Sequence, residues 1–151
     1  MKRILLALLF TPVAFAQDTP ALRLIIDGLA QEAAACGIGR PALEAVAART
    51  LKAHGVALST DANDPYLYLN VNAYRVMQGS TVVGCTTRLG VSVRAAVAGE
   101  SAVRAFKPKV EAYVVVCESG RLLSGARREM AGAVAMAFEA EIKTCLSQLS
   151  Y

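Results

Sequence analysis

Hydrophobic and polar residues alternate without a break along the middle of the chain. A period of two predicts a β-strand over residues 66–76, with one face in a core and the other facing a wetter environment. Gln78-Gly79-Ser80 then predicts a hairpin turn. The apolar positions are Leu67, Leu69, Val71 and Ala73, and the polar positions are Tyr66, Tyr68, Asn70, Asn72 and Tyr74.

The segment 81–97 is predicted to be the antiparallel partner of that strand. A third long strand is predicted over 110–125, where the apolar run 114–116 leaves the inward face ambiguous, and 98–108 is predicted to be a loop. In the segment 81–97, Val83, Cys85, Leu89, Val91, Val93 and Ala95 share one face, opposite Thr86, Arg88, Ser92 and Arg94.

Two segments repeat apolar residues at spacings of three and four, which is the period of an α-helix. The first, 41–54, starts with a proline suited to the first helical turn and is followed by Gly55, which favours a helix end. The second, 127–149, carries Glu139, Glu141 and Lys143 on its predicted polar side. The repeating positions are Leu43, Val46, Ala47, Thr50, Leu51 and His54 in the first helix, and Ala131, Val134, Phe138, Ile142, Cys145 and Leu149 in the second.

Shorter elements complete the predicted order. We expect a strand over 22–26, a helical turn or two within 29–35, and a short edge strand over 56–58. The chain is therefore predicted to be an α+β protein. Its architecture is expected to be a two-layer sandwich, in which a mainly antiparallel sheet of three to five strands carries two main helices on one face.

The layout and the string Asp64-Pro65-Tyr66-Leu67-Tyr68-Leu69-Asn70-Val71-Asn72 resemble small, mostly uncharacterised secreted bacterial proteins. More loosely, the layout is similar to auxiliary domains of envelope transport and assembly systems, such as the curli secretion-channel subunit and transport-auxiliary lipoproteins. The resemblance covers most of the chain after residue 16. It implies no site residues, and the chain departs from the lipoproteins because no cysteine follows the expected leader.

The first sixteen residues have the layout of a secretory signal peptide. A basic start (Lys2, Arg3) precedes a short apolar run, and the small-residue triplet ending at Ala16 suits cleavage there. The alternative is an uncleaved membrane anchor. We expect residues 1–16 to be removed and 17–151 to form a single α+β domain without stable membrane insertion, in the periplasm or secreted.

Composition and charge narrow the function. The chain has 151 residues, 55% of them hydrophobic and 19% charged, which excludes intrinsic disorder. Cleavage would remove Lys2 and Arg3 and no acidic residue, so the net charge would fall from +4 to +2. So small a charge gives no basic surface for nucleic acid, and no nucleic-acid partner is expected.

Four cysteines in an exported domain are expected to pair. Cys145 lies about 27 Å along the last helix, and Cys117 lies about 30 Å back along the preceding strand. If the helix folds back over that strand, Cys145 and Cys117 lie at the same height and can pair. Cys36 is then left to pair with Cys85. If Val114, Val116 and Leu122 face the helices, strand alternation turns Cys117 away from them. A bulge near Gly120, or the opposite choice of inward face, would remove this objection. A cross-strand Cys85–Cys117 pair is therefore the open alternative.

No residue pattern identifies catalytic chemistry. The cysteines lack metal-ligand or redox spacing, and neither a metal nor another cofactor is expected. His54, the one histidine, is expected to interact with the carbonyl end of its helix. The segment 37–40, before a helix, is only a weak anion-binding signal, and Arg127-Arg128 is expected to be a solvated first helical turn.

The polar face of the predicted hairpin is the candidate binding surface. Tyrosine and arginine are enriched at binding hot spots because they bury large areas while keeping polar groups. The alternatives are a merely wet sheet face, or a face covered by the chain's own loop 98–109. The candidate residues are Tyr66, Tyr68, Asn70, Asn72, Tyr74, Arg88 and Arg94.

We therefore expect a non-catalytic exported binding or assembly module that contacts a protein partner in the bacterial envelope. One alternative is a small periplasmic hydrolase with a site built from loops, around Ser119 or His54. The other is a structural envelope component that self-associates.

Overall fold

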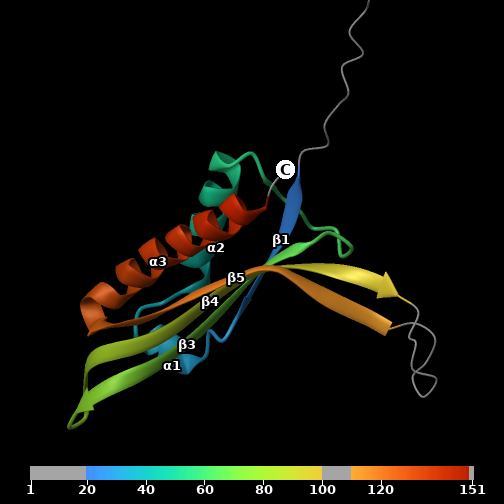
Figure 1. Ribbon diagram of the computed structural model, residues 1–151. Coiled ribbons are helices and arrows are strands. Elements are labelled where there is room, and N and C mark those ends of the chain that lie inside the picture. The colour runs from blue at the N-terminus through green and yellow to red at the C-terminus, as the bar shows by residue number, and fades with distance from the viewer. Residues whose placement is uncertain (1–19, 100–109, 150–151) are drawn as a thin grey trace, which may run out of the picture.

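The computed structural model describes residues 20–99 and 110–149, and the fold is α+β as the sequence predicted (Figure 1). The expected signal peptide, 1–16, lies outside the described residues, as does most of the expected loop 98–109. No helix of the described part is long and apolar enough to cross a membrane. The elements are β1 (Ala21–Asp27), α1 (Gln31–Ala35), α2 (Arg40–Ala53), β2 (Ala57–Leu58), β3 (Tyr66–Gln78), β4 (Thr81–Gly99), β5 (Val110–Ala126) and α3 (Arg127–Gln148).

The strands form one sheet in the order β2-β1-β3-β4-β5. β3, β4 and β5 are antiparallel neighbours, as predicted, whereas β1 runs parallel to both β2 and β3. Helices α2 and α3 bury their apolar sides against one face of this sheet (Figure 1). The largest fully buried side chains between the two layers include Leu43, Leu51, Leu67, Leu69, Phe138 and Ile142. We call the sheet face that points away from these helices the outer face.

The alternation in β3 sets the register of the central hairpin. Leu69 pairs with Val91 on the buried face, and Tyr68 pairs with Ser92 on the outer face. One predicted core residue is misplaced: a register shift leaves Val83 without a partner on β3, and its side chain is exposed. A bulge of this kind turns one side chain away from the face that its parity predicts.

The pairing with β4 sets the inward face of β5, and this strand contains a second bulge. Val93 pairs with Cys117 and Arg94 pairs with Val115, so Val116 is the extra residue. Cys117 points toward α3 like its partner Val93, whereas Leu122 is 69% exposed on the outer face. The bulge thus lies at Val116, not near Gly120, and no periodicity of side chains marks it because the run 114–116 is uniformly apolar.

Both disulfides join helical segments to the sheet. Cys36, at the end of α1, is bonded to Cys85 of β4, with a Cα–Cα distance of 6.1 Å. Cys117 of β5 is bonded to Cys145 of α3, with a Cα–Cα distance of 5.5 Å. The pairing is the same as that of the first scheme from the sequence. The parity objection does not apply, because Leu122 faces away from the helices, which is the opposite choice of face that the sequence left open.

A buried carboxylate reinforces the contact between β5 and α3. Glu141 lies one helical turn before Cys145 and is 4% exposed, although the helical pattern assigned it to the polar side. Arg121 Nε donates a hydrogen bond to Glu141 Oε1 at 2.8 Å, and the Ser119 hydroxyl donates to Oε2. Alternate residues of β5 thus meet successive turns of α3, because Cys117, Ser119 and Arg121 share the inward face.

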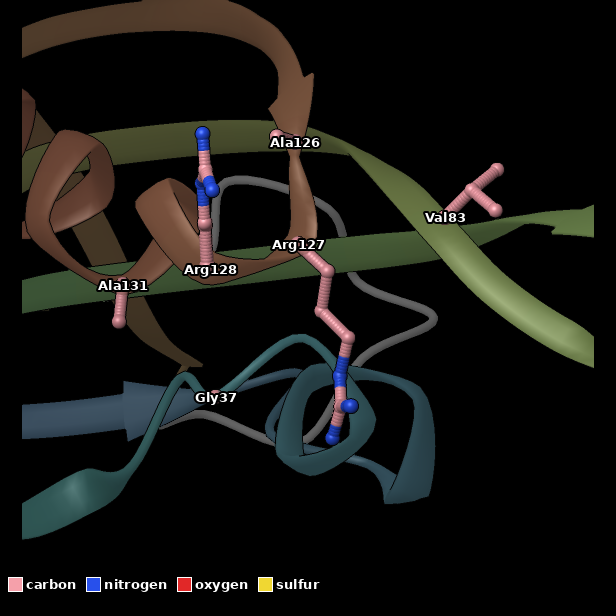
Figure 2. A pocket seen from close by; sticks show the side chains of 6 residues that line it. All are labelled: Gly37, Val83, Ala126, Arg127, Arg128 and Ala131. Carbon is pink, nitrogen blue, oxygen red and sulfur yellow. The ribbon is translucent and has the colours of Figure 1, made fainter.

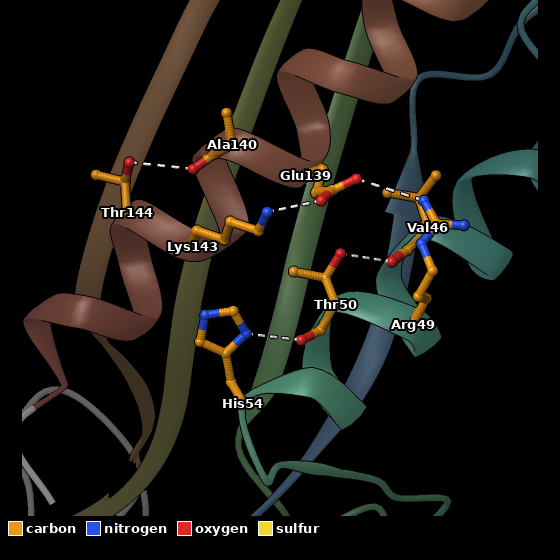
Figure 3. A network of polar contacts seen from close by, with 8 residues as sticks. All are labelled: Val46, Arg49, Thr50, His54, Glu139, Ala140, Lys143 and Thr144. Atoms are coloured by element: carbon orange, nitrogen blue, oxygen red, sulfur yellow. Dashed lines mark hydrogen bonds and ion pairs between the residues drawn. The ribbon is translucent and has the colours of Figure 1, made fainter.

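Exposed polar groups link α2 to α3 at the surface of the helical layer (Figure 3). Lys143 Nζ donates to Glu139 at 2.7 Å, and Arg49 of α2 reaches the same carboxylate at 3.4 Å. The hydrogen bond and charge of Lys143, followed by the hydrogen bond of Arg49, lower the pKa of Glu139. His54 caps α2 as expected: its Nδ1 donates to the Thr50 carbonyl at 2.8 Å.

We predict that Glu141→Ala lowers the free energy of unfolding by about 2 kcal/mol, because it leaves the Ser119 hydroxyl and the Arg121 guanidinium without their buried acceptor. Glu139→Ala is the matched control on the same helix. It removes only solvent-exposed ion pairs and should have a much smaller effect. Urea unfolding of both variants with the disulfides intact measures the difference, and equal losses would contradict the role given to Glu141.

Candidate functional site

The outer face of the sheet brings the predicted polar residues of β3 and β4 side by side. Tyr66 pairs with Arg94, Asn72 with Arg88, and Tyr74 with Thr86. Their exposure is graded along the strand, from the buried Tyr66 to Tyr74, which is 65% exposed. The hairpin register therefore places the tyrosine and asparagine row directly against the arginine row.

Strand β1 adds residues to this face that the sequence analysis did not include. Arg23 lies beside Tyr66 and Asp27 beside Asn70 in the parallel β1–β3 pair. The Arg23 guanidinium stacks over the Tyr66 ring at 5.4 Å from its centroid, and the Tyr68 hydroxyl donates to Asp27 Oδ2 at 2.9 Å. The polar residues at alternate positions of β1 could have indicated that this strand has a polar face. No pattern in the sequence indicated that β1 would lie beside β3.

Asp27 accepts hydrogen bonds from two sides. The Gly28 backbone N–H donates to Oδ1 at 2.7 Å, and Tyr68 donates to the other oxygen. These two bonds, the first the stronger, lower the pKa of Asp27, and the positive charge of Arg40 adds to the effect. Asp27 is thus held as a carboxylate that orients Tyr68 on the outer face.

The two arginines of β4, Arg88 and Arg94, differ in how many contacts their guanidinium groups make. The Arg94 guanidinium lies 4.1 Å from the centroid of the Tyr68 ring, and its Nε donates to the Ser92 hydroxyl at 3.0 Å. Arg88 is exposed and has no hydrogen bond or ion pair within residues 20–99 and 110–149. Arg94 is therefore held in place by its neighbours, whereas the charge of Arg88 is available to a ligand.

A hollow lies between these side chains, where Gly90 in its lining carries no side chain. Gly90 pairs with Asn70 on one side and with Gly120 on the other. A Cβ at Gly120 would lie 2.8 Å from the Leu89 carbonyl oxygen, so the backbone there excludes a side chain. The cavity has a volume of about 310 Å³, and its polar lining includes Tyr68, Asn72, Arg88, Ser92, Arg94 and Glu118.

Five of the seven predicted site residues line this hollow, and two do not. Tyr66 instead packs edge-on against the Tyr113 ring of β5, with 5.6 Å between centroids. Tyr74 lies further along β3, toward the hairpin turn. The five that line the hollow are Tyr68, Asn70, Asn72, Arg88 and Arg94.

A second cavity, of about 550 Å³, lies where α3 begins (Figure 2). Arg127 and Arg128 point in opposite directions there (Figure 2). Arg127 Nε donates to the Ala35 carbonyl at 2.8 Å, and Arg128 lies beside Glu129. Gly37 lines this cavity, but Arg40 turns to the Ile26 carbonyl, so the segment 37–40 does not gather basic groups here.

The residues weighed for catalysis are engaged in structural contacts. The Ser119 hydroxyl bonds to Glu141, and the His54 ring bonds to the end of α2. No hydrogen bond joins these two residues in the described part of the chain. Nor do residues 20–99 and 110–149 contain a group of three or more acidic, histidine or cysteine side chains arranged to hold a metal ion.

No protein-family model and no curated protein matches the chain. Several solved structures are similar to it, including two with low sequence identity. A minor lipoprotein from Acinetobacter baumannii has 16% identity and a TM-score of 0.37, over 83% of this chain and 94% of that chain. The rare lipoprotein B from Shewanella oneidensis has 17% identity and a TM-score of 0.39, over 85% of this chain and 92% of that chain.

Both of these proteins are described as lipoproteins. No family model or curated protein supports the resemblance to curli components. TM-scores below one half are too low to transfer a fold or a function. The properties of the site therefore follow from the residues of this chain.

We predict that Tyr68→Phe raises the pKa of Asp27 toward its ordinary value, because it removes one of the hydrogen bonds to the carboxylate. Because the pKa of Asp27 is lower in the folded than in the unfolded state, its carboxylate stabilises the fold at pH values above the unfolded-state pKa. This stabilisation is lost as the pH falls through the folded-state pKa. The variant should therefore be less stable than wild type at neutral pH, and the difference should disappear in strong acid.

Carboxyl NMR titration and urea unfolding at the two pH extremes measure these effects. Tyr74→Phe is the control, since the Tyr74 hydroxyl makes no hydrogen bond within the described ranges. An Asp27 pKa that is the same in Tyr68→Phe and wild type would show that Tyr68 does not hold the carboxylate.

Proposed function

We propose that the chain is a non-catalytic exported module that binds a protein partner in the cell envelope through the outer face of its sheet. One observation carries this proposal. The face opposite α2 and α3 presents a hollow lined by tyrosine, asparagine and arginine side chains, and the charge of Arg88 there has no partner among the described residues.

The disulfides support an exported location. All four cysteines are paired, and stable structural disulfides are typical of oxidising compartments such as the periplasm. The signal-peptide pattern of residues 1–16 points to the same compartment. We take cleavage after Ala16 and a single domain over 17–151 as part of the proposal.

The chemistry of the face favours a protein over a small molecule. Small-molecule sites are usually mostly apolar, whereas this hollow is lined mainly by polar side chains. Exposed apolar groups lie beside the polar hollow: Leu122 next to Arg88, and Tyr74 further along β3. A partner surface with an acidic side chain for Arg88 and an apolar contact for Leu122 would complement this arrangement.

No specific observation favours the hydrolase alternative, because Ser119 and His54 serve structural contacts. Self-association is compatible with partner binding, since it can use a different surface. The outer face is therefore the surface to test first.

We predict that replacing Tyr68 and Arg88 together by alanine abolishes recovery of the partner from the native envelope. Tyr68 orients Arg94, and Arg88 supplies the unpaired charge, so the double variant removes both features. Met136→Ala is the control, because Met136 is exposed but lies on α3, in the opposite layer.

The experiment places a photo-crosslinking residue at position 74, at position 122 beside Arg88, or at position 136. The same protein should be captured from positions 74 and 122 and not from position 136, and circular dichroism should show that the double variant stays folded. Undiminished recovery by the folded double variant, or capture from position 136 alone, would rule out the outer face as the binding surface.

A further inference from the structure

The last strands at the two edges of the sheet differ greatly in length. β2 has only two residues, whereas β5 has 17 residues. Within residues 20–99 and 110–149, β5 has a strand neighbour on one side only, which is β4. An edge strand presents a row of unpaired backbone N–H and C=O groups, which are a template for another strand.

The exposed end of β5 belongs to a ribbon of two strands. β3 begins opposite Arg94, so the β4 residues from Ala95 to Gly99 pair only with β5. Figure 1 shows the ends of β4 (yellow) and β5 (orange) extending past the helices and past β3. Two-stranded ribbons are marginally stable in water, and a further strand supplies the missing hydrogen bonds and apolar contacts.

The side chains on this part of the edge are unusually apolar. Tyr113, Val114, Val115 and Val116 are each about half exposed. Natural edge strands are usually protected against pairing with other chains by charged residues, by proline, by a short length or by a bulge. From Tyr113 to Cys117 the bulge at Val116 is the only such feature, and neither charge nor proline interrupts the run.

We propose that β5 pairs antiparallel with β5 of a second copy of this chain, centred on Val115. The choice of a second copy rests on the self-complementarity of the run. With this centre, Val115 meets Val115 of the other copy and Val114 meets Val116, and the bulge at Val116 ends the regular register beyond these residues. None of these residues is charged, so no like charges face each other at the centre of the new ladder.

The symmetry of this contact also fits the rest of the fold. A two-fold axis perpendicular to the sheet makes the interface isologous, so one contact covers the apolar edge of both copies. The same axis keeps both helical layers on one side and both outer faces on the other. The dimer therefore leaves the hollows lined by Arg88 open, and it does not depend on the proposed partner binding.

Sedimentation velocity on the exported, disulfide-bonded protein, from micromolar to near-millimolar concentration, tests the proposal. Wild type should form a dimer. Val114→Lys should weaken dimerisation about tenfold or more, because it places a charge opposite an apolar residue at an edge strand. Val114 pairs with Ala95 and not with an arginine, so the lysine meets no native charge in its own copy.

Val76→Lys is the matched control, since Val76 is 47% exposed and Val114 is 49% exposed, but Val76 lies on β3. Its dimerisation should equal that of wild type. A wild-type protein that stays monomeric over the whole range, or equal weakening by the two lysine variants, would overturn the proposal.

A covalent test examines the register. Residues directly opposite in antiparallel strands have Cα atoms about 4.5–5.5 Å apart, which a disulfide spans. Val115→Cys should therefore form an intermolecular disulfide under mild oxidation, whereas Val76→Cys should not. If both cysteine variants crosslink equally, or neither does, the β5 pairing is wrong, whatever the result of the partner-binding experiment.

Discussion

The burial of one face of the sheet beneath α2 and α3 is the constraint on which the structure depends. Leu67, Leu69 and Val71 are completely excluded from solvent on that face. A slip of one residue in the β3–β4 register would exchange them with the tyrosine and asparagine row. The hydrophobic core therefore determines both the inner face and the composition of the outer face, although the outer face contributes little to the core.

The contacts that hold α3 against β5 maintain this arrangement. The Cys117–Cys145 disulfide and the Glu141 carboxylate lie one helical turn apart, and both engage inward residues of the same strand. The disulfide restricts the unfolded chain. The carboxylate is satisfied only when Arg121 and Ser119 face the helix. The two contacts thus require the same strand parity, which the unbroken pairing of these β5 residues with Leu89, Val91 and Val93 of β4 supplies.

The sequence was most informative where one face is buried and the pattern is periodic. The strict alternation over residues 66–76 predicted β3, its inward face and its pairing with β4, and the three-and-four spacing predicted α2 and α3. It could not place the bulges at Val83 and Val116, because an extra residue in an apolar run changes no side-chain pattern. Nor could it show that β1 lies parallel beside β3, since local patterns carry no information about non-local neighbours.

The same limit explains which parts of the outer face were missed. Tyr68, Asn72, Arg88 and Arg94 were predictable because they belong to one hairpin with a defined register. The contact of Tyr68 with Asp27 depends on the β1–β3 pairing, and the hollow depends on the missing side chain of Gly90 between β3 and β5. Both features arise between strands, where a missing side chain or a distant carboxylate leaves no trace in the periodicity of either strand.

The distribution of hydrogen bonds on the outer face bears on how it would bind. Tyr68 is held by Asp27, Arg94 by Ser92 and the Tyr68 ring, and Thr86 contacts Ser124 at 3.1 Å. These side chains are already ordered before a ligand arrives, so binding costs less conformational entropy. Arg88 lies among these fixed groups with its charge unpaired in the described residues. An acidic group of a ligand gains an ion pair without breaking an existing bond only if it is placed at Arg88. Fixed polar side chains around one available cation therefore favour selective recognition of an acidic group over non-specific adhesion.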